Sequence, residues 1–187
     1  MHFCAVSAMA EDGGVTTPAT ERIVPVTVNR VELEAETPFV ALRAALEREV
    51  PPLDERRLAT LLRSGASWAQ LTREVSGPGA LVRFWTYDPT PVMRVGGADL
   101  AAAGYLLGDY VTAARMFRHD PGTTLYTPVR LELHARGSRT VVAFDQPSSA
   151  LKAFGNNKIT QAGFELDRLL GDLLEDLGLP RPSILRL

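Results

Sequence analysis

The spacing of apolar and polar positions changes repeatedly along the chain, and each change predicts a new element. From Val26 to Glu34 the two kinds of residue alternate, which predicts a first strand. The run at residues 80–87 is apolar on both faces, so we expect a central strand that is covered on two sides. Further strands are expected at residues 101–107, 129–134 and 139–144.

Helical spacing of apolar residues predicts helices between these strands. Good capping residues precede several of them: Thr37 with Pro38 behind it, Asp54, Ser67 and Asp109. In the helix after Ser67, Trp68 and Leu71 are expected to face inward. The expected helices cover residues 39–50, a short stretch after 54, 68–75, 110–117 and 159–177.

The helix after Asp109 carries a stripe of small and aromatic residues. The stripe consists of Tyr110, Ala113, Ala114 and Phe117. Residues three and four apart share one face of a helix, so this stripe is expected to pack on the core.

A hairpin follows, with residues 135–138 as its loop. If His134 opposes Arg139, then Leu131 opposes Val142, and one mostly apolar face turns toward the core. The segment from Asp145 to Ser149 ends the hairpin, and Ser148 or Ser149 is expected to cap a short helical turn that runs to Phe154. The hairpin and its exit thus predict an antiparallel pair followed by a helical corner.

These elements together predict an α+β fold, a single domain with a mainly antiparallel sheet and helices packed on it. Residues 1–21 lack periodicity and are expected to be a disordered head that can be deleted with little loss of stability. The domain is expected to span residues 22–178, with a helical insertion at about 54–75, and residues 179–187 form a tail.

Charge and cysteine content narrow the classes of function. The chain has 187 residues and a formal net charge of -2, with no basic face for nucleic acid and no polybasic cluster for a membrane surface. The single cysteine, Cys4, forms no internal disulfide, and no apolar run is long enough to span a bilayer. Although Ala8-Met9-Ala10 is similar to a signal-peptidase site, no Lys or Arg precedes it and the apolar part is short, so we expect a cytoplasmic protein, with a secreted form as the alternative.

A series of short motifs in the second half of the chain carries a family resemblance. In order they are Gly108-Asp109, Ala113-Ala114, Arg118-His119-Asp120, Leu125-Tyr126 before Pro128, residues 145–149, and Leu166-Asp167. This arrangement resembles domain-of-unknown-function family 302, over residues 26–177. The resemblance implies a compact α+β fold that often pairs into a homodimer, and it implies no catalytic residue. Members of the family often have Asn where this chain has Asp109.

The candidate chemistry is sparse. His119, between an arginine and an aspartate, could act as an acid–base group or as a metal or haem ligand, but a cation at a helix C-terminus is also ordinary capping. Asp145 is the other catalytic candidate, although it also suits a turn, and His134 lies on a polar strand face. No metal-ligand spacing and no nucleotide-binding motif is present, so the cofactor is unknown, with haem as the one candidate.

We expect a ligand site between the loop 118–126 and the corner 145–149, because an antiparallel hairpin brings these segments to one end of the sheet. The leading hypothesis is a soluble small-molecule-binding protein, accessory or regulatory in role. The alternatives are an enzyme of small-molecule metabolism that uses the same cleft, and a structural interaction module. The expected ligand-binding residues are Arg118, His119, Tyr126, Asp145, Ser148 and Ser149. Aromatic residues that could line a pocket or form the core are Trp68, Trp85, Tyr87, Tyr105, Tyr110 and Tyr126.

Overall fold

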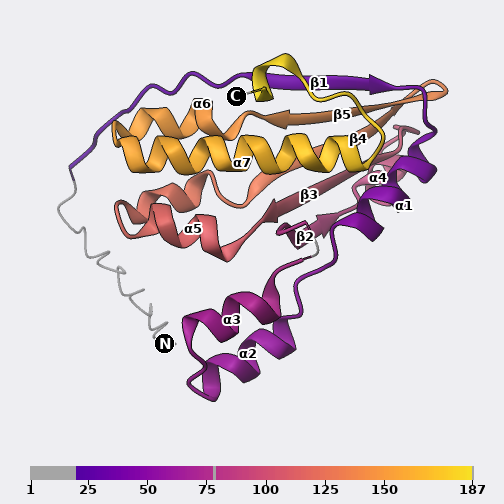
Figure 1. The fold of residues 1–187 in the computed structure, drawn as a ribbon. Helices are drawn as coiled ribbons and strands as arrows, with labels where there is room; N and C mark the ends of the chain where they lie inside the picture. The colour runs from indigo at the N-terminus through magenta and orange to yellow at the C-terminus, as the bar shows by residue number, and fades with distance from the viewer. Residues whose placement is uncertain (1–19, 78, 187) are drawn as a thin grey trace, which may run out of the picture.

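A computed structural model describes residues 20–77 and 79–186 (Figure 1). Its centre is a five-stranded antiparallel sheet in the order β1-β5-β4-β3-β2. The predicted α+β fold with a mainly antiparallel sheet is therefore confirmed. The strands are β1 (Arg30–Ala35), β2 (Val82–Tyr87), β3 (Ala102–Gly108), β4 (Val129–Arg136) and β5 (Arg139–Asp145).

The helices follow the predicted order, with one addition. The run from Thr90 to Val95 forms a short helix that was not predicted from the sequence. Figure 1 shows α5, α6 and α7 lying across one face of the sheet, with α2 and α3 apart from it. The helices are α1 (Phe39–Glu49), α2 (Glu55–Arg63), α3 (Trp68–Val75), α4 (Thr90–Val95), α5 (Tyr110–Phe117), α6 (Pro147–Leu151) and α7 (Asn157–Asp176). Three 3-10 turns are η1 (Pro121–Leu125), η2 (Lys152–Phe154) and η3 (Ser183–Leu185).

The main core lies between one face of the sheet and the helices. On the inner strands, Leu131 pairs with Phe144 and Leu133 with Val142, so alternate residues of β4 and β5 point to the same side. Leu166 and other apolar residues of α7 pack against this side, and Leu42 and Leu46 of α1 join the same cluster. Burying alternate strand residues under an amphipathic helix is what the sequence pattern required.

The opposite face of the sheet carries charged side chains. Arg30 and Glu32 on β1 lie across from Asp145 and Ala143 on β5. Together with His134 on β4 they border a shallow trough of about 700 Å³. The polar strand face expected for His134 is therefore present, with its Nδ1 3.0 Å from a carboxylate oxygen of Glu132.

A buried polar network joins the corner after β5 to the long helix α7. Asp167 is fully buried and accepts hydrogen bonds from the Ser148 backbone N–H at 3.0 Å, the Ser148 hydroxyl at 2.6 Å and the Gln146 amide at 2.8 Å. The expectation that Ser148 or Ser149 caps the turn is wrong, because the Ser148 hydroxyl is taken by Asp167 and the N-cap is Gln146. Close approach of the two helices also needs Gly163, where a Cβ would come within 2.9 Å of the Ser148 backbone.

Two strand predictions need correction. The first strand begins at Arg30 rather than Val26, and residues 20–29 form neither helix nor strand. The apolar strand at 80–87 is not central: β2 is an edge strand, and Trp85 and Tyr87 are exposed. An aromatic-rich strand has the same sequence pattern whether both of its faces are covered by protein or one face is exposed to water. The pattern therefore could not distinguish a central strand from an edge strand.

The hairpin register differs from the predicted one by two residues. Arg136 opposes Arg139, so the turn has only two residues, Gly137 and Ser138. Gly137 has φ +61°, the left-handed conformation that a glycine adopts readily at the first position of such a turn. Because the shift is an even number, the predicted apolar face survives unchanged.

The structure describes most of the C-terminal tail but little of the N-terminal head. Most of the expected head, residues 1–19, lies outside the described residues. At the other end the tail docks through Leu185, which is almost completely buried in the main core. Among the helices of the described ranges, none is long and apolar enough to span a membrane.

Candidate functional site

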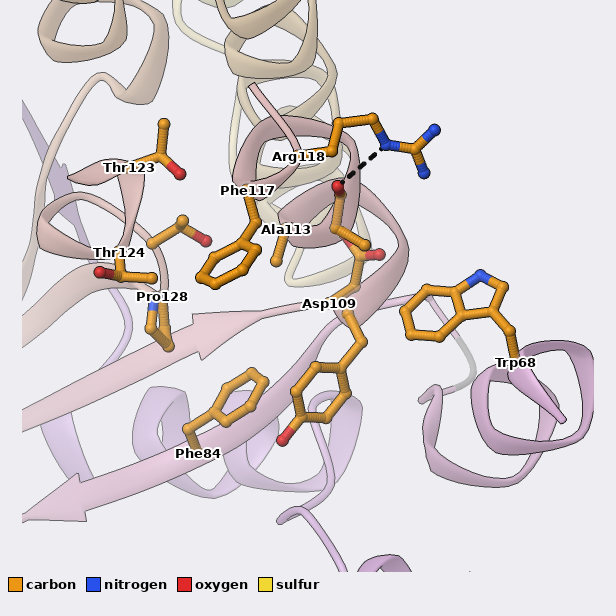
Figure 2. A pocket seen from close by; sticks show the side chains of 12 residues that line it. Trp68, Phe84, Asp109, Ala113, Phe117, Arg118, Thr123, Thr124 and Pro128 are labelled. Carbon is orange, nitrogen blue, oxygen red and sulfur yellow. Dashed lines mark hydrogen bonds between the residues drawn. The ribbon is translucent and has the colours of Figure 1, made fainter. Parts of the chain in front are cut away.

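A mostly apolar hollow with a volume of about 660 Å³ lies beside α5. It is bounded by α3, β2, α5, the η1 turn and the segment that leads into β4 (Figure 2). We call it the aromatic cleft. Its lining residues are Trp68, Phe84, Asp109, Tyr110, Ala113, Ala114, Phe117, Arg118, Thr123, Thr124, Thr127 and Pro128.

Helix α5 supplies the main wall of the aromatic cleft. The face of α5 that packs on the core carries Thr112 and Met116, both of which are buried. The predicted inner stripe therefore points elsewhere: Ala113 is only partly buried, and Phe117 is 53% exposed. The expectation that this stripe packs on the core is wrong, and the stripe lines the cleft instead.

Two aromatic rings close the cleft on the other sides. Phe84 of β2 packs edge-on against Tyr110, with ring centroids 5.2 Å apart. Trp68, the first residue of α3, is 51% exposed, so its expected inward orientation is wrong, whereas that of Leu71 is confirmed. Tyr110 also packs on the small cluster of α2 and α3, so the helical insertion positions Trp68 at the cleft.

Asp109 places a carboxylate at the N-terminus of α5. Its Oδ1 accepts a hydrogen bond from the Thr112 backbone N–H at 2.8 Å, which is the predicted N-cap. Its Oδ2 is buried and has no hydrogen-bond partner among the described residues. An unpaired buried oxygen of this kind costs about 1–3 kcal/mol, so Asp109 is an unusual feature of the site.

Four hydroxyl groups, those of Tyr110, Thr123, Thr124 and Thr127, and one guanidinium complete the polar lining. The Thr123 and Thr124 hydroxyls donate to the backbone carbonyls of Asp120 and Pro121, both at 2.9 Å. Burial, with a smaller contribution from the Glu55 carboxylate, raises the pKa of Tyr110, so its phenol stays protonated. Arg118 is exposed at the rim, and its Nε donates to the Ala114 carbonyl at 3.3 Å (Figure 2).

The predicted corner forms a separate and smaller hollow. Tyr126 and Asp145 both line it, as expected from the antiparallel hairpin, together with Gln146 and Pro128. Its volume is about 140 Å³, below the usual range of roughly 300–1,000 Å³ for ligand pockets. The Tyr126 ring packs edge-on against Phe154, which holds it in place.

The remaining predicted site residues are spread over different surroundings. Ser148 is fully buried in the Asp167 network. The Ser149 hydroxyl donates to the Gln146 carbonyl and accepts from the Asn29 backbone N–H. His119 is exposed just beyond α5, and the catalytic role considered for it stays a prediction. Of the six expected ligand-binding residues, Arg118 is the one that lines the aromatic cleft.

The described ranges 20–77 and 79–186 contain no candidate metal site. Groups of three or more His, Cys, Asp or Glu side chains that could hold an ion are not found there. The charges on the open sheet face are instead paired with one another, as in Arg139 with Glu34 at 3.2 Å.

Sequence reasoning missed most of the aromatic cleft because a stripe that lines a cleft has the same spacing as one that packs on a core. One signal was present: the apolar side chain of Met116 lies outside the stripe, so a second face of α5 could also pack on the core, and in the structure Met116 is buried. Trp68 and Tyr110 had been named among possible pocket residues, and both line the cleft.

Comparison with known proteins bears on the fold. No protein-family model matches the chain, and no curated protein does. The chain is similar to the crystal structure of an uncharacterized conserved protein, DUF302, from Bacillus stearothermophilus, with a TM-score of 0.57 and 11% sequence identity. The match covers 79% of this chain and 97% of that one. The resemblance to domain-of-unknown-function family 302 is thus confirmed as a shared α+β fold.

Proposed function

We propose that this protein binds a small, predominantly apolar molecule in the aromatic cleft. The observation that carries the proposal is the combination of a volume of about 660 Å³ with four aromatic side chains, contributed by α3, β2 and α5, that surround it. This volume lies within the roughly 300–1,000 Å³ typical of small-molecule sites, which are mostly apolar with a few polar groups.

The exposure of the rim supports the same proposal. Trp68 and Phe117 are each about half exposed, which leaves roughly 100 Å² of each side chain in water. If a ligand covered half of that total area, it would contribute about 2–3 kcal/mol to binding. The main core is already closed by α7 and α1, so these rings are not needed to complete it.

A fluorescent apolar probe, N-phenylnaphthylamine, tests the proposal on the full chain. We expect saturable binding with increased probe fluorescence. An Ala113→Phe variant should weaken it about tenfold, because the added ring takes space that the probe needs, and overpacking costs about 1–3 kcal/mol. The matched control is Val111→Phe, which adds the same ring to the exposed side of the same helix.

The control should bind the probe as the wild type does, and circular dichroism should show that both variants are folded. Absence of saturable binding by the wild type would contradict the proposal. An equal loss in both variants would place the probe somewhere other than the cleft.

A further inference from the structure

The polar lining of the aromatic cleft includes a group of hydrogen-bond acceptors. The Thr123 and Thr124 hydroxyls each donate their hydrogen to a backbone carbonyl. Toward a ligand, these hydroxyls can therefore act only as acceptors, through their oxygen lone pairs. Asp109 adds a carboxylate, which in its ionised form accepts hydrogen bonds and donates none. Donors are present at Tyr110, at the Thr127 hydroxyl and at Arg118, which lies exposed at the rim.

Asp109 is the group that most needs a partner. It is only 5% exposed, and its Oδ1 is held by the helix cap, while Oδ2 has no partner in the described part of the chain. A buried carboxylate is stabilised when an opposite charge and a hydrogen-bond donor reach it. Figure 2 shows Asp109 beside the lining of the cleft, between α5 and the side of Trp68.

The aromatic rings favour the same kind of partner. The faces of Trp, Tyr and Phe rings attract cations, and cages of such rings are a known way to bind organic ammonium groups. Trp68, Phe84, Tyr110 and Phe117 surround the cleft that Asp109 borders. One carboxylate and several ring faces in a single hollow therefore suit a positively charged nitrogen better than a neutral hydroxyl group.

We propose that the aromatic cleft selects an organic cation, a protonated amine on an apolar body, whose ammonium group donates a hydrogen bond to Asp109 Oδ2. This inference rests on the proposed function. Because Oδ2 is buried, the donor reaches it only after a neighbouring side chain has moved aside. Arg118 opposes the cation only weakly, since its guanidinium is at the solvated rim.

Three probes of nearly the same shape test this selection on the full chain by calorimetry and by displacement of N-phenylnaphthylamine. They are phenethylamine, which is protonated at neutral pH as a lysine amine is, neutral phenethyl alcohol, and anionic hydrocinnamate. We expect phenethylamine to bind at least about tenfold more tightly than the alcohol, the size expected for a hydrogen bond to a charged group. Hydrocinnamate should bind most weakly.

The variant Asp109→Asn removes the charge and retains a residue that caps helices well, so the fold should persist. In it, the preference for phenethylamine over the alcohol should fall to within about twofold. The matched control is Asp120→Asn, which removes the same charge from an exposed cap outside the cleft. That control should keep the wild-type preference.

The outcomes separate the two proposals. If the wild type binds the amine no more tightly than the alcohol, or if Asp109→Asn keeps the preference, the cation inference is wrong while apolar binding stands. If the wild type binds neither these probes nor N-phenylnaphthylamine, the proposed function itself is wrong. If Asp120→Asn also loses the preference for phenethylamine, the preference arises from the net charge of the protein rather than from Asp109, and the inference is overturned. The wild-type comparison decides the matter even if Asp109→Asn fails to fold.

Discussion

Replacing Asp167 by alanine should destabilise the fold more than most single substitutions do. The change removes the acceptor of three buried hydrogen bonds, from the Ser148 backbone, the Ser148 hydroxyl and the Gln146 amide. The hydroxyl can turn to another partner, and the Gln146 amide keeps a long contact of 3.4 Å to the Ile184 carbonyl. The Ser148 N–H, at the start of α6, has no such alternative in the described structure.

The expected size follows from these contacts. One orphaned buried N–H costs about 1–3 kcal/mol, and loss of a charged acceptor from a buried network raises the total to about 3–5 kcal/mol. In a domain of this size each kcal/mol shifts the melting temperature by roughly 2–4 °C. We therefore expect Asp167→Ala to melt about 10 °C below the wild type.

Urea denaturation followed by circular dichroism measures the change, with a common m-value as evidence that the denatured states are comparable. The control is Asp176→Asn, an exposed position on the same helix, which should stay within about 0.5 kcal/mol. In the double variant with Ser148→Ala, the loss should be smaller than the sum of the two single losses, because both act on one network. A loss below about 1 kcal/mol for Asp167→Ala would refute this reasoning.

Two further predictions concern acid stability and assembly. Burial raises the pKa of Glu47, but hydrogen bonds from Arg43 and the Tyr105 hydroxyl outweigh it and hold that pKa below its usual value. A lowered carboxyl pKa stabilises the fold above about pH 4.3 and loses that effect as the pH falls, so Glu47→Gln should lose less stability between pH 6 and pH 3 than the wild type, and an equal loss in urea midpoints would count against it. We also expect a homodimer, because Trp85 and Tyr87 stack on each other while exposed at the edge of the open sheet face, and light scattering that gives the 20.3 kDa mass of one chain would end this prediction.

The elements that sequence reasoning located well are those whose ends are set by local chemistry. Asp54, Ser67 and Asp109 each accept a hydrogen bond from a backbone N–H three residues later, as their residue types predict. A cap of this kind depends on a few neighbouring residues, so the sequence alone contains the needed information. The even spacing of apolar residues likewise determined which face of the β4–β5 hairpin turns to the core.

The position of β2 and the lining of the cleft were decided by tertiary structure. Trp85 lies on an edge strand because β3 is the one strand that pairs with β2 among the residues that the structure describes. Nothing within residues 80–87 encodes the lack of a second neighbour. The α5 stripe faces the aromatic cleft because the adjoining face of α5, with Met116, is the one that packs on the core. Trp68 of α3 lines the same cleft rather than packing against the stripe to close it. Periodicity states which residues share a face, but what that face meets depends on contacts between segments far apart in the chain.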